Sequence, residues 1–300
     1  MTLRYAKIVV RCLPLCLLGV VFWREKPWQV QLSSSMPWAI AATVLLNFGV
    51  FLPIKAARWR VALTDPPPFP QVFAATIEGL LASAAIGFGS GDVVRSARLR
   101  EHTQRLPADY ACTWAERGAE VLALAILVFV AAAVMKLGAL AMVLSALAAM
   151  GYLALLATGR WLVPRLGAWP RLQRPLSAGL SASTPKRVAG MAALSLAGWG
   201  SEIVMLVLFQ SAFHLNLSFQ VALLTLVGIN AAIVIPTLPG NFGTFEAGAI
   251  MALVMCGVPR DIAVFYALTY HLTHAIPVAL VATTVYLVRS HRRSSDRART

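Results

Sequence analysis

The sequence predicts an all-α polytopic membrane protein, from its composition, its long apolar segments and the basic residues between those segments. Of its 300 residues, 59% are hydrophobic and only 13% are charged, and the mean hydropathy is +0.73. A soluble domain usually carries about 25% charged residues. A water-soluble fold of this composition would expose a large apolar surface. We therefore expect residues 1–300 to form a single membrane domain covered by lipid.

Positive charge sets the expected partners. The net charge is +14, and the basic residues lie between apolar segments and at the two ends of the chain. That distribution fits the positive-inside rule and contact with anionic lipid headgroups. We therefore expect membrane lipids as partners and no nucleic acid.

No motif indicates a cofactor or a metal. The sequence has no nucleophile elbow, P-loop or dinucleotide-binding fingerprint. A pair of histidines, His271 and His274, could bind a metal with Glu246, but there is no HExxH motif and no third close ligand. The four cysteines include no CxxC pair and are expected to be small core residues. We expect neither a cofactor nor a metal site.

Nine apolar segments follow one another along the chain. A hydrocarbon core about 30 Å thick takes about 20 helical residues to cross, and two of the segments are too short or too rich in glycine for ordinary spans. The nine segments are Ile8–Trp23, Met36–Ile54, Val72–Phe88, Ala108–Met135, Leu137–Ala157, Val188–Phe213, Leu217–Ile235, Phe245–Val258 and Ile262–Val288. The first resembles a signal peptide, but no clear cleavage site follows it, so we expect a retained helix.

Basic residues set the expected orientation. They gather at the N-terminus, after the second segment, in the stretches Ser90–Pro107 and Gly159–Arg187, and in the tail 289–300. All of these are cytoplasmic only if Val72–Phe88 enters and leaves the membrane on the same side. We therefore expect about eight spans and one re-entrant hairpin in a bacterial inner membrane, with both termini and the tail cytoplasmic. If Val72–Phe88 crosses fully instead, the arginines after it lie outside, against the rule.

Two apolar segments are broken by glycine and proline. Gly87–Arg95 reads GFGSGDVVR and Pro236–Glu246 reads PTLPGNFGTFE, and an offset of 151 places Arg95 opposite Glu246. Irregular backbone at membrane depth is tolerated only inside protein or beside a wet cavity. Paired broken segments in two halves typically mark the binding site of a transporter. We therefore expect two related halves with the site at the breaks; the alternative is a pair of ordinary turns at the membrane interface.

Several ionisable residues lie inside apolar segments, where a charge costs roughly 2.5–3.5 kcal/mol unless it is paired. Glu116 and Glu120 share one helix face, which suits a basic partner such as Arg58 or Arg95. Alternatively, Arg58 and its neighbours form an anchor at the interface, and Glu116 with Arg117 lies at headgroup level.

Acidic and histidine side chains recur in the second half. Glu202 lies well inside an apolar run, and Glu246 follows the second break. These two are the hardest to explain as interfacial residues. Together with His271 and His274 they leave a proton relay open as an interpretation.

These residues resemble a known family, the flippase-like membrane domain of lysylphosphatidylglycerol synthases and their stand-alone relatives. The resemblance covers roughly residues 40–288. Its parts are Lys-Ala-Ala-Arg-Trp at the end of the second segment, Gly-Asp-Val-Val-Arg at 91–95, Glu116-Arg117, Pro236 through Glu246, and Tyr270 with Pro277. Asn241 occupies a position often held by glycine, and His271 stands where arginine is expected. Both differences could alter headgroup selectivity or pH response.

The resemblance implies movement of a phospholipid, isoprenoid or hopanoid-type lipid between membrane leaflets. The chain lacks the soluble aminoacyl-transferase domain of the full-length synthases, so we do not expect it to make an aminoacylated lipid. One alternative is a membrane enzyme with Glu246 or His271 as general base. Another is a scaffold in a lipid or lipid-linked glycan pathway. A homo-oligomer or a lipid-pathway enzyme as partner is left open.

The expected translocation site combines both breaks with the charged residues around them. Arginines would engage an anionic headgroup, carboxylates would balance the arginines or a cationic headgroup, and proline and glycine would hold the second break open. The expected residues are Arg58, Asp92, Arg95, Arg98, Glu116, Arg117, Glu202, Pro239, Gly240, Asn241, Gly243, Glu246, Tyr270 and His271.

Overall fold

A computed structural model describes residues 19–20, 23–24, 33–87, 89–103, 106–136, 138–167, 169–215, 218–233 and 239–297. These residues form helices and turns, without a strand among them. Most of the first predicted segment, Ile8–Trp23, lies outside the described residues. The elements are α2 (Met36–Leu46), η2 (Asn47–Phe51), α3 (Leu52–Ala62), α4 (Phe69–Ile86), α5 (Ser90–Thr103), α6 (Leu106–Met135), α7 (Ala139–Leu162), η3 (Val163–Arg165), α8 (Pro170–Ala182), α9 (Pro185–Gln210), η4 (Ser211–Phe213), α10 (Phe219–Ile233), η5 (Pro239–Asn241), α11 (Thr244–Met255) and α12 (Arg260–Arg297).

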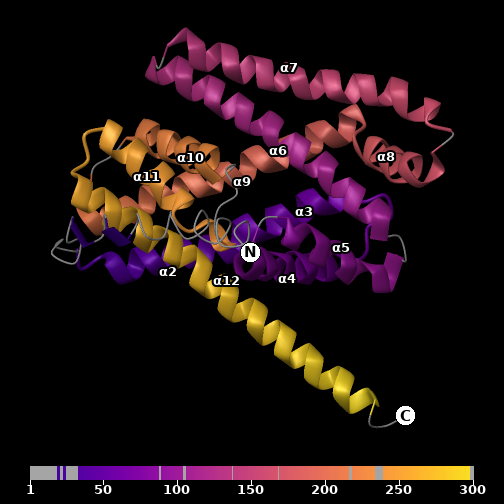
Figure 1. The fold of residues 1–300 in the computed structure, drawn as a ribbon. Coiled ribbons are helices and arrows are strands. Elements are labelled where there is room, and N and C mark those ends of the chain that lie inside the picture. Colours follow the sequence, from indigo (N-terminus) through magenta and orange to yellow (C-terminus); the bar gives the residue numbers. More distant parts are fainter. Residues whose placement is uncertain are drawn as a thin grey trace, which may run out of the picture.

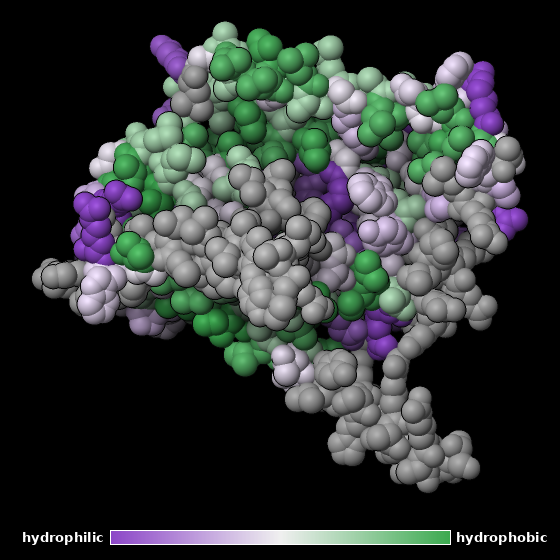
Figure 2. All heavy atoms as spheres, viewed as in Figure 1, coloured by the Kyte–Doolittle hydropathy of each residue, from purple (hydrophilic) through white to green (hydrophobic). Residues whose placement is uncertain are grey.

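Six helical stretches of the described chain are long and apolar enough to cross a membrane by length and composition. They are Met36–Ala62, Phe69–Ile86, Tyr110–Met135, Ala139–Arg165, Pro185–Phe213 and Arg260–Val285. Figure 2 shows apolar side chains over much of the described surface on one face, with hydrophilic residues at its two ends. The chain is therefore a multi-pass helical membrane protein, as its composition predicts.

The first broken segment forms a helical hairpin. After α4 the chain turns at Gly87 and Gly89, which have φ angles of 108° and 81°, and α5 returns along α4. The helices approach so closely that a Cβ on Gly79 would lie 2.8 Å from the carbonyl oxygen of Gly91. The basic stretch that starts at Ser90 is thus mostly helix α5, the second arm of the hairpin, and not the loop that the sequence suggested.

The second broken segment forms another hairpin, from α10 and α11. We expected two separate spans here, but these helices have 15 and 12 residues, which corresponds to only about 22 and 18 Å at 1.5 Å per residue. A Cβ on Gly228 of α10 would lie 2.7 Å from the carbonyl oxygen of Gly248 on α11. The second hairpin therefore repeats the glycine contact of the first. Residues 236–238 of the break lie outside the described residues.

The tips of the two hairpins meet, although the last turn of α4 before the first tip is exposed. η5, at the tip of the second hairpin, packs against α4 of the first, and a Cβ on Gly240 would lie 3.7 Å from the carbonyl oxygen of Ala84. In Figure 1 the pair α10 and α11 lies toward the left end of the molecule, and α4 and α5 lie toward the right. The hairpins thus extend from opposite ends toward a shared centre.

The helices around the hairpins form an inverted repeat. Ser33, just before α2, donates its backbone N–H to the carbonyl of Ala212 at the end of α9, while Gly190 near the start of α9 faces Val61 at the end of α3. The stretch α2–α3 therefore runs antiparallel to α9. Each is followed by a hairpin and then by a long helix, α6 or α12. The packing repeats as well, because α4 packs on α12 while α10 packs on α6.

The remaining helices, α7 and α8, stand outside this repeat. α7 packs on α6. Only 6% of the residues in its most apolar stretch are buried in the structure, so the helix faces lipid. The sequence suggested a loop from Gly159 to Arg187, but residues 170–182 of that stretch form α8, which packs on α6.

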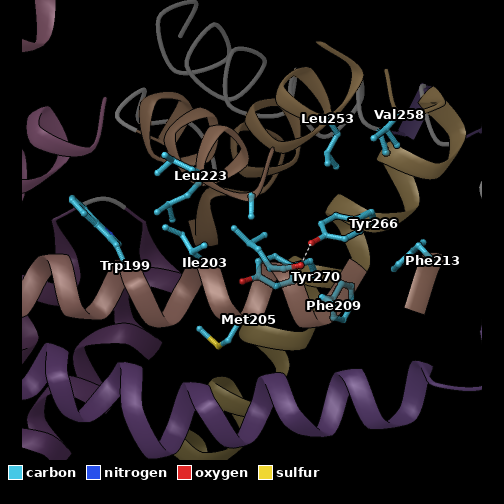
Figure 3. Close-up of a cluster of buried hydrophobic side chains, with 14 of the residues drawn as sticks. Trp199, Ile203, Met205, Phe209, Phe213, Leu223, Leu253, Val258, Tyr266 and Tyr270 are labelled. Atoms are coloured by element: carbon cyan, nitrogen blue, oxygen red, sulfur yellow. Dashed lines mark hydrogen bonds between the residues drawn. The ribbon is translucent and has the colours of Figure 1, made fainter. Parts of the chain in front are cut away.

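Aromatic packing holds α12 against α9. Phe209 of α9 contacts the rings of Tyr266 and Tyr270 at centroid distances of 5.4 and 5.2 Å, and the Tyr266 hydroxyl donates to the carbonyl of Leu206. Figure 3 shows these rings within one buried cluster to which Leu223 and Leu253 also belong. This cluster fixes the register of α12 and so positions Tyr270 and the residues after it.

The inverted arrangement predicts the labelling pattern of single cysteines in a cysteine-free background. Ser218→Cys before α10 and Pro259→Cys after α11 should react with a membrane-impermeant maleimide from one side of the membrane. Asp65→Cys before α4 and Lys186→Cys in the first turn of α9 should react from the other side. Labelling of residues 218 and 259 from opposite sides would show that the chain does not return to its starting side between them, which would contradict the hairpin.

The close glycine contact predicts the effect of one methyl group. In Gly248→Ala the new Cβ would lie 2.8 Å from the carbonyl carbon of Gly228 and 2.9 Å from the Cβ of Ala232, so we expect a loss of about 1–3 kcal/mol. In the control Gly190→Ala the Cβ meets only Val61, at 4.0 Å, and stability should hold or rise because alanine favours helix. Thermal unfolding in detergent measures both, and equal midpoints would contradict the close contact.

Candidate functional site

Glu116 of α6 links two arginines from different elements. Its Oε1 accepts from Nε of Arg58 on α3 at 3.0 Å, and its Oε2 accepts from Nη2 of Arg95 on α5 at 2.5 Å. All three side chains are buried, with residue exposures of 0%, 5% and 4%. A buried carboxylate shared by two guanidinium groups joins a span, a hairpin arm and a second span at one point.

Three more ionic side chains extend this contact. Arg95 lies 2.9 Å from Asp92, and Arg117 donates to Asp92 at 3.1 Å and to Glu120 at 2.9 Å. Glu120 in turn lies 3.1 Å from Nη2 of Arg58. Together these side chains form the first charged cluster, which consists of Arg58, Asp92, Arg95, Glu116, Arg117 and Glu120. Arg117 is its most exposed member, at 47% for the side chain.

Burial decides between the two interpretations of Arg58. Trp59, its neighbour, is fully buried, and its ring lies under the guanidinium of Arg95 at 4.6 Å. Of Arg58, Trp59 and Arg60, only Arg60 is exposed, and it donates to the carbonyl of Pro67. Arg58 and Trp59 therefore belong to the interior and do not form an anchor at the membrane surface.

Arg98 lies apart from the first charged cluster. It pairs with Glu78 at 3.1 Å, across the two arms of the first hairpin. The structure thus uses Arg98 to join α5 to α4 and does not bring it to Glu116.

Glu246 closes the second break. Its Oε2 accepts the backbone N–H of Gly243 at 2.7 Å, and its Oε1 lies 2.8 Å from Nδ1 of His271 on α12. The turn before it needs positive φ at Gly240 (70°), Asn241 (59°) and Gly243 (88°). Asparagine is among the few non-glycine residues that adopt this conformation readily. The side chain of Glu246 therefore caps α11 and joins the tip of the hairpin to α12.

Glu202 lies on the other side of α12. The hydroxyl of Tyr270 donates to its Oε1 at 2.8 Å, and Nε2 of His274 lies 3.7 Å from the same oxygen. Phe245 stacks on His271 at 4.2 Å. We call Glu202, Glu246, Tyr270, His271 and His274 the second charged cluster. Within the described residues, no group of three or more histidine, cysteine, aspartate or glutamate side chains is placed to hold a metal ion.

The two clusters occupy matching places in the inverted repeat. In the first half the ionic side chains come from the span before the hairpin (Arg58), its second arm (Arg95) and the span after it (Glu116). In the second half the corresponding elements carry Glu202, Glu246 and His271. Carboxylates thus stand in the second half where the first half has arginines. Among the described residues, the ion pairs that involve these clusters stay within one cluster, and none of them links one cluster to the other.

Three residues of these contacts were not among the expected translocation residues, although the sequence analysis had noted Glu120 and His274. Ser195 on α9 accepts from Nη1 of Arg58 at 3.0 Å, and no sequence signal marks it. Glu120 and His274 stand one helical turn from Glu116 and Tyr270, and this spacing was the signal available for them.

The chain was compared with models of known protein families. The model of the lysylphosphatidylglycerol synthase TM region matches residues 6–282. The chain belongs to this family. Searches of curated proteins and of solved structures found no significant match. The matched residues include both hairpins and both charged clusters of this lysylphosphatidylglycerol synthase TM region protein.

The position of Glu116 predicts a large effect of neutralising it. Glu116→Gln leaves Arg58 and Arg95 buried beside a neutral amide, and removing one partner of a buried ion pair typically costs about 3–5 kcal/mol. Glu120→Gln should cost less, since the Glu120 side chain is 21% exposed and Arg58 keeps Glu116. Denaturant or thermal unfolding in detergent measures both losses. If both variants unfold at the same midpoint, Glu116 does not have the central role assigned to it.

Proposed function

We propose that the chain is a flippase-like lipid translocase that moves a lipid with a charged headgroup between membrane leaflets. The carrying observation is the pair of hairpins that meet tip to tip, each with an ionisable residue of its second arm buried close behind the tip. Arg95 has this place in the first hairpin and Glu246 has it in the second. A lipid-related membrane role also agrees with the family match.

The hydrocarbon core is the barrier that such a protein has to lower. A charge at its centre costs roughly 2.5–3.5 kcal/mol even on the mildest scale, so a headgroup needs polar partners across its path. Broken helices supply these partners, because backbone groups and charged side chains are exposed where a helix is interrupted.

The inverted repeat supports alternation between two sides. In transporters of this kind, one repeat rocks against the other and opens the shared site to each side in turn. Here the halves touch where α9 meets α2, α3 and α6, where α4 meets η5 and α12, and where α6 meets α10. We infer that these contacts are the surfaces that move, while each charged cluster holds its own half together.

The orientation follows from the basic residues. Arg60 and Arg98 lie on elements at the right of Figure 1, and α8 with the basic stretch 159–187 lies there as well. By the positive-inside rule this end would be cytoplasmic, in a bacterial inner membrane. The first hairpin would then enter from the cytoplasm and the second from the outside.

Lipid crossing in reconstituted vesicles tests the proposal. Fluorescent phosphatidylglycerol in vesicles of phosphatidylglycerol and phosphatidylethanolamine should become accessible to an external quencher faster with the protein than without it. Arg95→Ala and Glu246→Ala should slow crossing by at least about tenfold, equivalent to 1.4 kcal/mol in the barrier, because each removes the charge beside a tip.

Asp261→Asn, at the start of α12 and outside both clusters, is the matched control. In vesicles with this variant, lipid should cross at the wild-type rate. Crossing that is unchanged in both tip variants would place the path elsewhere. Wild-type rates equal to those of protein-free vesicles would contradict translocation of this lipid.

A further inference from the structure

Glu202 is an acidic side chain inside a membrane span, and neither lysine nor arginine stands beside it in the described part of the chain. It lies near the middle of Pro185–Phe213 and is 9% exposed. Tyr270 donates its hydroxyl to Oε1 of Glu202 at 2.8 Å and Tyr266 donates to the carbonyl of Leu206, but neither tyrosine brings a positive charge. No lysine or arginine nitrogen of the described residues lies within 4.0 Å of this carboxylate. A carboxylate at this depth is costly unless it is paired with a cation or takes up a proton.

The nitrogen of His274 that faces Glu202 carries a proton only when the ring is charged. Nδ1 of His274 lies 3.0 Å from the carbonyl oxygen of Tyr270. Because a carbonyl oxygen can only accept, Nδ1 carries a hydrogen, and in the neutral ring Nε2 then has a lone pair. Nε2 is buried and lies 3.7 Å from Oε1 of Glu202. In the neutral ring a lone pair therefore faces a carboxylate, and one added proton turns this contact into an ion pair.

His271 does not need an additional proton for its contact. Its Nδ1 lies 2.8 Å from Oε1 of Glu246, so a neutral ring with its hydrogen on Nδ1 already donates to the carboxylate. Glu246 also accepts the backbone N–H of Gly243. Of the two histidines, His274 is thus the one that has to bind another proton to attract its carboxylate.

Within the described residues, the elements around the Glu202–His274 pair bring it no other cation. α2, α4 and α11 pack on α12. α2 has no ionisable residue, Glu78 of α4 pairs with Arg98 at 3.1 Å, and Glu246 of α11 is engaged at the hairpin tip. The other charged residues of α9 lie in its first turn, about four turns before Glu202. His274 is therefore the basic side chain that the described structure offers to Glu202.

We infer that Glu202 and His274 form a proton-binding site inside the second half of the protein. The pair binds its proton as a unit, and the bound proton makes the pair neutral and joins α9 to α12. Loss of the proton leaves one net negative charge. His274 stands one helical turn after His271, which contacts Glu246 at the hairpin tip. Control of lipid crossing by this charge rests on the proposed function, whereas the proton site itself does not.

NMR of the full chain with isotope-labelled histidine rings observes this proton directly. Histidine changes its charge between about pH 5 and 8, so the spectra should cover about pH 5 to 9. Nδ1 of His274 should stay protonated throughout, while the signal of Nε2 should move from its lone-pair position to its protonated position as the pH falls. The variant His274→Gln identifies both signals by their loss.

Thermal unfolding in detergent measures whether the proton stabilises the contact between α9 and α12. The ion pair is present at low pH and is lost as the pH rises. The unfolding midpoint of the wild type relative to His274→Gln should therefore be higher at about pH 5.5 than at about pH 8.5, by about 2 °C or more. Glutamine donates to Glu202 at every pH and binds no proton. Glu202→Gln, which keeps an acceptor for the Tyr270 hydroxyl, should lose the same pH-dependent part.

His214→Asn is the matched control for the unfolding measurement. His214 is an exposed histidine outside both charged clusters, with a φ of 54°, and asparagine adopts this conformation readily. This variant should keep the pH dependence of the wild type. Loss of that dependence in His214→Asn would assign the bound proton to the exposed histidine and overturn the site.

Lipid crossing with the same pH on both sides of the vesicle tests the functional part. Crossing of fluorescent phosphatidylglycerol should slow by at least about threefold between about pH 5.5 and 8.5, because the deprotonated pair places a negative charge near the tip and repels an anionic headgroup. In His274→Gln the rate should be nearly independent of pH, since this side chain does not titrate.

The outcomes separate the proton site from the proposed function. An Nε2 that keeps its lone pair down to about pH 5, with equal pH dependence of unfolding in wild type and His274→Gln, overturns the site. Proton binding in both measurements, with lipid crossing that does not depend on pH, keeps the site and overturns its control of crossing. A protein that binds the proton but moves no lipid at any pH contradicts the translocase and leaves the proton site standing.

Discussion

The shared contact of Glu116 with Arg58 and Arg95 is the constraint on which the first half of this protein depends. A carboxylate in the membrane interior is stable only when it is paired, and here the pairing comes from two other elements. The span α3, the hairpin arm α5 and the span α6 therefore cannot separate without exposing a buried charge. The hairpin, which has too few apolar residues in α5 to be held by lipid, is fixed by this electrostatic contact.

The second half solves the same problem with other residues. Glu246 satisfies the backbone of its own hairpin tip and reaches His271, while Glu202 is held by Tyr270. In the second half, the aromatic cluster around Phe209 fixes the position of α12. In the first half, ionic contacts hold the helices together. Two arginines of the first half are matched by carboxylates in the second, although the helices of both halves follow the same order.

The charge balance of the first half connects its structure to ligand binding. Its arginines are already engaged by carboxylates, so a headgroup would have to compete for them. Lys55, one helical turn before Arg58, differs in that no carboxylate of the described side chains lies within 4.0 Å of its ammonium.

Hydropathy, helix-breaking residues and the cost of a charge in lipid are local properties. They are enough to predict the membrane class, most of the long helices, both breaks and a contact of Glu116 with Arg58 or Arg95. They do not show that α10 and α11 form a second hairpin, because an apolar segment suits a buried half-helix and a full span equally well. That the tips meet and that Arg98 pairs with Glu78 depends on which helices pack together, and the packing is visible only in the folded structure.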